Sequence, residues 1–84
     1  MRQITYTKEA TKTLSRMPAN VSKLIRAKVK QYAEDPSSLA NNVKTLQGHE
    51  NRLRLRVGDW RVLFNETGEV VAVLKVAPRG GAYE

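Results

Sequence analysis

The sequence predicts an α+β fold in which two N-terminal helices pack on one face of a small, mainly antiparallel sheet. The expected order is strand, helix, helix, strand, strand, strand. Two observations support this order. Residues 8–32 hold two stretches of apolar residues at helical spacing, separated by a proline, and residues 52–76 hold alternating and continuous apolar runs that are typical of strands. With 84 residues, the chain is expected to form a single domain, residues 1–84, around one core.

The first strand and the first helix follow from local signals. Ile4 and Tyr6 alternate with polar neighbours, as in a short strand with one buried face. Thr7 is a suitable N-cap for a helix over 8–16, because its hydroxyl can accept a hydrogen bond from the first turn. Pro18 then ends this helix.

A second helix is expected after Pro18, which fits a first helical turn. Its apolar residues form one stripe: Val21, Leu24, Ile25, Val29 and Tyr32. The helix is expected to end at Asp35-Pro36, since a proline disfavours helical conformation in the residue before it. Residues 37–50 are interpreted as a polar connector anchored on the core by three apolar side chains, those of Leu39, Val43 and Leu46.

Three strands are expected near residues 52–57, 60–65 and 69–76. The last is almost continuously apolar, which predicts a central strand buried on both faces. The first two form a hairpin, because Gly58-Asp59 supplies a two-residue turn. Its inward face is expected to be apolar, with Leu53, Leu55, Val57, Trp60, Val62 and Phe64.

The outward face of this hairpin carries four arginines, which we call the arginine face: Arg52, Arg54, Arg56 and Arg61. Pairing of Val57 with Trp60 across the turn places Arg56 opposite Arg61. Like charges opposite each other destabilise a sheet. We therefore interpret the arginine face as a surface for binding polyanions. The structural alternative is a set of ordinary solvent-facing strand residues, with Arg56 paired to an acid such as Asp59 or Glu66.

Composition narrows the function classes. The formal net charge of +7 favours an acidic partner such as nucleic acid. The chain has no cysteine, which excludes disulfides and thiolate metal sites. No apolar run approaches the roughly 20 residues that span a bilayer, and residues 1–6 lack the apolar core of a signal peptide. We therefore expect a cytoplasmic protein with no membrane partner.

Five features of the chain belong together: the order of its elements, Leu46-Gln47-Gly48, the run 52–64, the strand 70–76, and Arg79 with Tyr83. In this combination the chain resembles the RelE/ParE toxin superfamily. The resemblance covers nearly the whole chain and is most specific in the hairpin, where it points to the RelE-like branch. It implies a RelE-like fold and a toxin of a type II toxin–antitoxin pair. Members of that branch enter the ribosomal A site and cut messenger RNA without a metal or cofactor, using the 2′-hydroxyl as nucleophile. The implied partners are a cognate antitoxin, mRNA and the ribosome with its 16S rRNA.

The resemblance also implies roles for individual residues. Arg52 and Arg54 fall where the RelE branch often has basic catalytic residues, commonly lysines, and Arg56 falls on a further basic position. Arg61 matches the arginine that stabilises the phosphate. Two further matches lie near the C-terminus: Arg79, with the arginine at the end of the last strand, and Tyr83, with the tyrosine of the tail.

The general base stays open at this point. A guanidinium remains protonated in proteins, so Arg52 and Arg54 are poor proton acceptors. Tyr83 and His49 are the candidates, and Tyr83 has the alternative role of stacking on a nucleotide base. The third alternative is that neither is the base and that transition-state stabilisation by the arginines carries most of the rate. Two other functions remain: a ParE-like inhibitor that binds DNA gyrase, and an RNA-binding module without cleavage.

Overall fold

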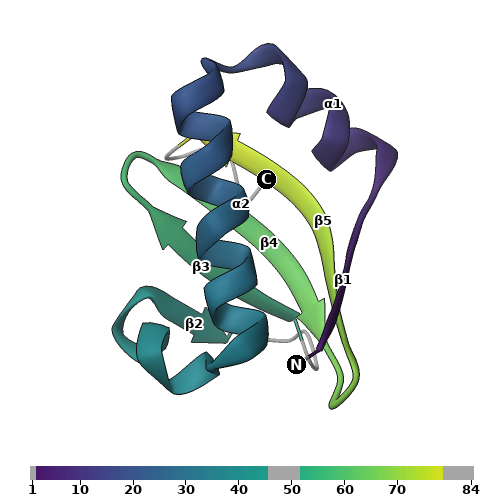
Figure 1. Cartoon of the computed structure of the whole chain (residues 1–84), viewed down its shortest axis with the longest axis vertical. Helices are drawn as coiled ribbons and strands as arrows, with labels where there is room; N and C mark the ends of the chain where they lie inside the picture. Colours follow the sequence, from purple (N-terminus) through teal and green to yellow (C-terminus); the bar gives the residue numbers. More distant parts are fainter. Residues whose placement is uncertain (1, 46–51, 79–84) are drawn as a thin grey trace.

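The computed structural model describes residues 2–45 and 52–78, which form two α-helices, a short 3-10 helix and a five-stranded sheet (Figure 1). In chain order the elements are β1 (Gln3–Tyr6), α1 (Lys8–Arg16), α2 (Ala19–Glu34), η1 (Pro36–Asn42), β2 (Val43–Thr45), β3 (Arg52–Val57), β4 (Trp60–Glu66) and β5 (Val70–Pro78). The predicted α+β class and the order of the predicted elements are confirmed. The sheet has one strand more than predicted, namely β2.

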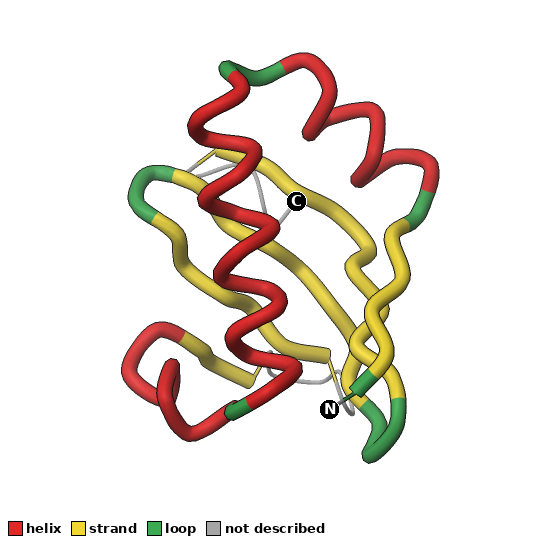
Figure 2. Tube along the Cα trace, in the orientation of Figure 1, coloured by secondary structure: helices red, strands yellow, loops and turns green. Residues whose placement is uncertain are grey.

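The strands are arranged in the order β1-β5-β4-β3-β2 (Figure 2). β1 runs parallel to β5, and every other neighbouring pair is antiparallel, so the sheet is mainly antiparallel as expected. β5 lies inside the sheet, but the prediction that both its faces are buried is wrong. Val71, Val73 and Val76 are buried, whereas Val70 and Leu74 are half-buried, because α1 and α2 cover one face of the sheet.

The helix boundaries agree with the local signals. The Thr7 hydroxyl accepts a hydrogen bond from the backbone N–H of Ala10 at 3.1 Å and donates one to the carbonyl of Leu74 at 2.7 Å. This residue therefore caps α1 and attaches its start to β5. α2 begins at Ala19, so Pro18 is its N-cap residue and stands just before the first turn in which it was expected.

The core lies between the two helices and one face of the sheet. Figure 1 shows α2 crossing in front of the strands. Ile25 and Tyr32 of α2 and Leu14 of α1 are buried in one cluster with the sheet residues Phe64 and Val73. The Tyr32 ring meets the Phe64 ring edge-on, with the centroids 4.9 Å apart. The predicted packing of both helices on one face is thus confirmed.

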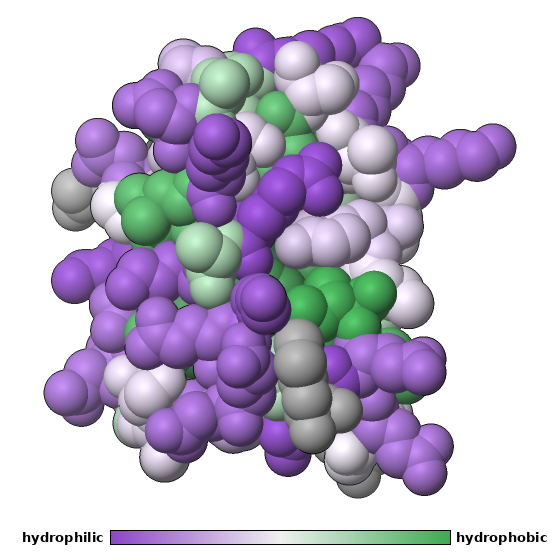
Figure 3. Space-filling model, viewed as in Figure 1, coloured by the Kyte–Doolittle hydropathy of each residue, from purple (hydrophilic) through white to green (hydrophobic). Residues whose placement is uncertain are grey.

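One residue of the predicted apolar stripe lies outside the core. Leu24 is 48% exposed on α2, whereas Ile25 beside it is completely buried. The surface around α2 is mostly hydrophilic, with apolar side chains showing between the polar ones (Figure 3). The predicted burial of Leu24 is therefore wrong, because the buried side of α2 is turned toward Ala33, which is 1% exposed.

The predicted connector contains regular structure. Its first part folds as η1, and Leu39 in η1 is buried, as expected for an anchor. Its next part is β2, whose Val43 packs against the core from a half-buried position. Leu46 lies outside the described residues. Within the described ranges, no helix combines the length and apolar character needed to cross a membrane.

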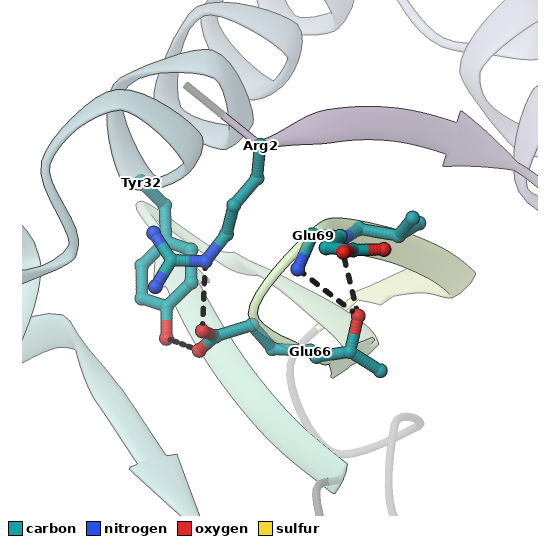
Figure 4. A network of polar contacts seen from close by, with 6 residues as sticks. Arg2, Tyr32, Glu66 and Glu69 are labelled. Atoms are coloured by element: carbon teal, nitrogen blue, oxygen red, sulfur yellow. Dashed lines mark hydrogen bonds and ion pairs between the residues drawn. The ribbon is translucent and has the colours of Figure 1, made fainter.

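A polar network joins α2, β4 and the residue before β1 (Figure 4). The Tyr32 hydroxyl donates a hydrogen bond to Oε1 of Glu66 at 2.5 Å, and Nε of Arg2 lies 2.9 Å from Oε2 of the same carboxylate. Burial, together with the hydrogen bond to Glu66, raises the pKa of Tyr32 above its ordinary value. Glu66 is the single acidic residue of β4, and this network holds its carboxylate on the side of the sheet that faces α2.

Candidate functional site

The β3–β4 hairpin presents the arginine face as predicted. Val57 pairs with Trp60 and Arg56 with Arg61. The turn between the strands uses Gly58 at a φ of 57°, a left-handed conformation that glycine adopts without steric cost. Both the predicted strand boundaries near the turn and the predicted register are confirmed.

The inward face of the hairpin is the apolar surface that was predicted. Leu55, Val57, Val62 and Phe64 are all buried in the core. Trp60 packs against this cluster, which confirms its assignment to the core side. Because side chains alternate along a strand, burying these residues directs the arginines to the opposite face.

β2 adds a cation that sequence reasoning missed. It pairs antiparallel with β3, and this register sets Lys44 directly opposite Arg54. Lys44 therefore lies on the same face of the sheet as the arginines. Its side chain is exposed. Two like-charged pairs now lie on neighbouring rows of one face, Lys44 with Arg54 and Arg56 with Arg61.

These residues surround a hollow of about 230 Å³, which we call the basic hollow. It is lined by Asn41, Asn42, Lys44, Arg54, Arg56 and Arg61. Four of the six side chains carry a positive charge, and none of the six is acidic. Nη1 of Arg61 donates a hydrogen bond to the carbonyl of Trp60 at 3.3 Å, which helps to hold this half-buried side chain in place. Guanidinium forks and an ammonium around one space are suited to binding phosphate oxygens.

The acids considered as partners for Arg56 do not pair with it. Glu66 forms its ion pair with Arg2 instead. Asp59 is exposed in the hairpin turn. The structural alternative for Arg56, an ion pair with either acid, is therefore not realised, and its exposed guanidinium lines the basic hollow.

Arg52 is separated from the other three arginines. It lies opposite Asn65, at the far end of the hairpin from the turn, and its Nε donates a hydrogen bond to Oδ1 of Asn65 at 3.5 Å. The residues that line the basic hollow come from the end nearer the turn, and from β2 and η1. The structure thus brings Arg54, Arg56 and Arg61 together and places Arg52 outside this group.

Three predicted site residues, Arg79, Tyr83 and His49, lie outside the described residues. Three lining residues, Asn41, Asn42 and Lys44, were not predicted at all. The only sequence signal for Lys44 is its place between Val43 and Thr45, a stretch too short to indicate a strand. Within residues 2–45 and 52–78, no three His, Cys, Asp or Glu side chains gather where they could hold a metal ion.

Comparison with known proteins identifies the family of this chain. A family model described as the ParE toxin of the type II toxin–antitoxin system parDE matches residues 4–83. The chain belongs to this toxin family. The match includes both helices and the whole arginine face.

Relatives with RelE names share the sequence pattern and the fold. The chain is 24% identical to Toxin RelE3 of Methanocaldococcus jannaschii, over 98% of this chain and 96% of that protein. It superposes with a TM-score of 0.77 and 25% identity on the archaeal RelE–RelB complex from Pyrococcus horikoshii, covering 95% of this chain and 97% of that one. The superposition on the isolated RelE toxin of E. coli has a TM-score of 0.77 at 19% identity, and it covers 99% of this chain and 92% of that one. The fold is therefore that of the RelE/ParE superfamily.

Proposed function

We propose that the protein is a metal-independent endoribonuclease toxin that cleaves ribosome-bound mRNA by attack of a 2′-hydroxyl on the adjacent phosphate. The observation that carries this proposal is the basic hollow, where one lysine and three arginines gather with no acid among the lining residues that the structure describes. The RelE names of the relatives support the same activity. A cytoplasmic location follows from the proposed substrate.

The hollow matches the charge requirements of this reaction. As the 2′-oxygen attacks phosphorus, negative charge builds up on the non-bridging phosphate oxygens. Cations already in position stabilise that charge without reorganisation. Arg61 and Arg56 lie opposite each other on adjacent strands, so their guanidinium groups can bind the two non-bridging oxygens from neighbouring sites. We assign Arg61 the central role, since its side chain is partly buried and hydrogen-bonded to the backbone.

A cognate antitoxin is the proposed protein partner. RelE of Pyrococcus horikoshii was crystallised with RelB, and the E. coli toxin with its antitoxin in the intact RelBE complex. A chain with a net charge of +7 favours an acidic or amphipathic segment as its ligand. We expect this segment to cover the basic surface or to displace the C-terminal tail, which would hold the toxin inactive.

The ParE name of the matching family supports a second candidate function, the inhibition of DNA gyrase without chemistry. A protein that only binds gyrase has no chemical need for four cations around one hollow. The two functions give different results with purified targets. The ribonuclease truncates mRNA on programmed ribosomes, whereas the gyrase inhibitor lowers DNA supercoiling and leaves the mRNA intact.

The deciding experiment compares the wild type, Arg61→Ala and Arg16→Ala in single-turnover cleavage on programmed ribosomes, read by primer extension. Loss of one phosphate-stabilising donor lowers the rate by about 10²–10³-fold, and growth inhibition should disappear with it. Arg16 is exposed on α1, so its substitution removes the same charge far from the hollow and serves as the matched control. Wild-type toxicity in a folded Arg61→Ala protein would contradict the assignment. Intact mRNA combined with inhibited gyrase would establish the second candidate instead.

A further inference from the structure

We infer that Lys44 is a catalytic residue of the basic hollow and donates the proton that the departing 5′-oxygen needs. This inference rests on the proposed ribonuclease function. Lys44 lines the hollow together with Arg54, Arg56 and Arg61. It comes from β2, an element that the sequence pattern did not reveal, and it is exposed to a ligand entering from solvent.

The six lining side chains differ in their capacity for proton transfer. The three guanidinium groups remain protonated throughout the accessible pH range, and the amides of Asn41 and Asn42 do not titrate. An ammonium group carries its proton at neutral pH and can release it to a strong base such as an alkoxide. Among the described lining residues, Lys44 is thus the one side chain that combines a positive charge with a transferable proton.

The position of Lys44 suits the leaving-group side of the phosphate. β3 separates β2 from β4, and adjacent strands lie about 4.8 Å apart. Arg61 is also two residues along β4 from Leu63, which lies across from Lys44, so the backbones at Lys44 and Arg61 are roughly 12 Å from each other. Long side chains from these two strands can reach a phosphate from opposite sides, with Arg54 and Arg56 on the strand between them. Because the attacking and leaving oxygens must lie on opposite sides of phosphorus, a donor on the β2 side can serve the leaving oxygen.

In the proposed step, one phosphorus–oxygen bond forms and another breaks. The 2′-oxygen forms a bond to phosphorus, and its proton passes to a general base of the protein or to water. The bond between phosphorus and the 5′-oxygen breaks, and its electron pair stays on that oxygen. The 5′-oxygen takes a proton from the Lys44 ammonium, which becomes an amine and regains a proton from water. The products are a 2′,3′-cyclic phosphate and a 5′-hydroxyl.

The test uses Lys44→Arg, which keeps the positive charge and removes the transferable proton. In single-turnover cleavage on programmed ribosomes, this variant should bind like the wild type and cleave about 10²–10⁴-fold more slowly. Lys44→Ala should lose both cleavage and part of the salt-dependent binding. Lys30→Arg makes the same exchange at an exposed position of α2 and should behave as the wild type.

A second substrate separates proton donation from positioning. When sulfur replaces the bridging 5′-oxygen, the leaving group departs without needing a proton. Lys44→Arg should then cleave within a few-fold of the wild type, whereas Arg61→Ala should stay slow. The inference is overturned if Lys44→Arg cleaves the normal substrate at the wild-type rate, or if its defect is equally large with the sulfur substrate. Failure of the wild type to cleave RNA at all would overturn the proposed function and the inference together.

Discussion

Removing the Tyr32 hydroxyl should destabilise the fold by a predictable amount. Tyr32→Phe deletes the hydrogen bond to the Glu66 carboxylate and keeps the ring that meets Phe64 edge-on. A hydrogen bond to a charged group contributes about 1.5–3 kcal/mol. The Glu66 side chain is 20% exposed and keeps its contact with Arg2, so water and the guanidinium compensate in part. We therefore expect a loss of roughly 1–2 kcal/mol, or about 5–15 °C in Tm.

The effect should depend on pH in a defined direction. Burial raises the pKa of Tyr32 in the folded state. Below the unfolded-state pKa of about 10, the hydroxyl is protonated in both states and the full stabilisation is present. At higher pH the unfolded chain loses this proton first, so the stabilisation falls by at most about 1.4 kcal/mol per pH unit. The difference in unfolding free energy between wild type and Tyr32→Phe should therefore shrink above pH 10.

Urea unfolding followed by circular dichroism, from neutral pH to above pH 10, measures this difference directly. Tyr6→Phe is the matched control, because Tyr6 is a half-buried tyrosine whose ring is covered by the Arg26 guanidinium at 5.2 Å. Since phenylalanine keeps that ring, this variant should remain close to the wild type at neutral pH. A Tyr32→Phe protein as stable as the wild type at neutral pH, or a difference that stays constant above pH 10, would refute the reasoning.

Three further predictions concern the base, the antitoxin and the turn. Tyr83→Phe should lower cleavage far more than RNA binding, and His49→Ala should lower cleavage less than Tyr83→Phe does. If Tyr83→Phe cleaves like the wild type and His49→Ala is inactive, His49 is the base. The affinity for the antitoxin should fall as salt rises in calorimetric titrations, because rim charges are screened over about 8 Å at physiological ionic strength, and a salt-independent affinity would contradict this. Gly58→Ala should cost about 1–2 kcal/mol of unfolding free energy, since Gly58 has a φ of 57°. Gly68→Ala, where an added Cβ meets open space, is its control, and equal losses in both variants would argue against backbone strain.

The hairpin was predictable because its signals are local. Strict alternation of arginine with leucine or valine assigns each residue to a face, and a two-residue turn fixes the register between the strands. The pairing of Arg56 with Arg61 follows from these two facts alone, and the structure confirms it. A shift of one residue would have exposed the whole apolar set.

The buried face of α2 was harder to predict, because the spacing of its apolar residues does not decide which side of Ile25 is buried. Successive helical residues are about 100° apart, so Leu24 and Ala33 lie on opposite sides of Ile25 around the helix axis. The sheet covers the side with Ala33 and leaves Leu24 about half exposed. Leucine is the more apolar residue, and spacing alone therefore favoured the wrong edge. Packing against the sheet, which no local pattern reports, decides between them.

The basic hollow could be predicted only in part. Its three arginines come from the alternating hairpin, whereas Lys44, Asn41 and Asn42 come from β2 and η1. β2 has three residues, and three residues show no periodicity that separates a strand from a loop. Lys44 reaches the hollow because β2 pairs with β3, a contact between distant parts of the chain. The residue that we assign to proton transfer was therefore invisible in the sequence.

Magnitudes indicate why the fold tolerates so many cations on one face. Favourable cross-strand pairs contribute about 0.2–1 kcal/mol each, and like charges opposite each other are destabilising. The described sheet has two such like-charged pairs around the hollow, so their cost is on the order of 1 kcal/mol each at most. On the other face, Leu55, Val57, Val62 and Phe64 are buried, and each contributes about 1.5–3 kcal/mol. The apolar face thus outweighs the repulsion several-fold, and the hairpin does not depend on its arginines for stability. Substitutions in the basic hollow should accordingly leave the protein folded, which is what allows them to report on chemistry.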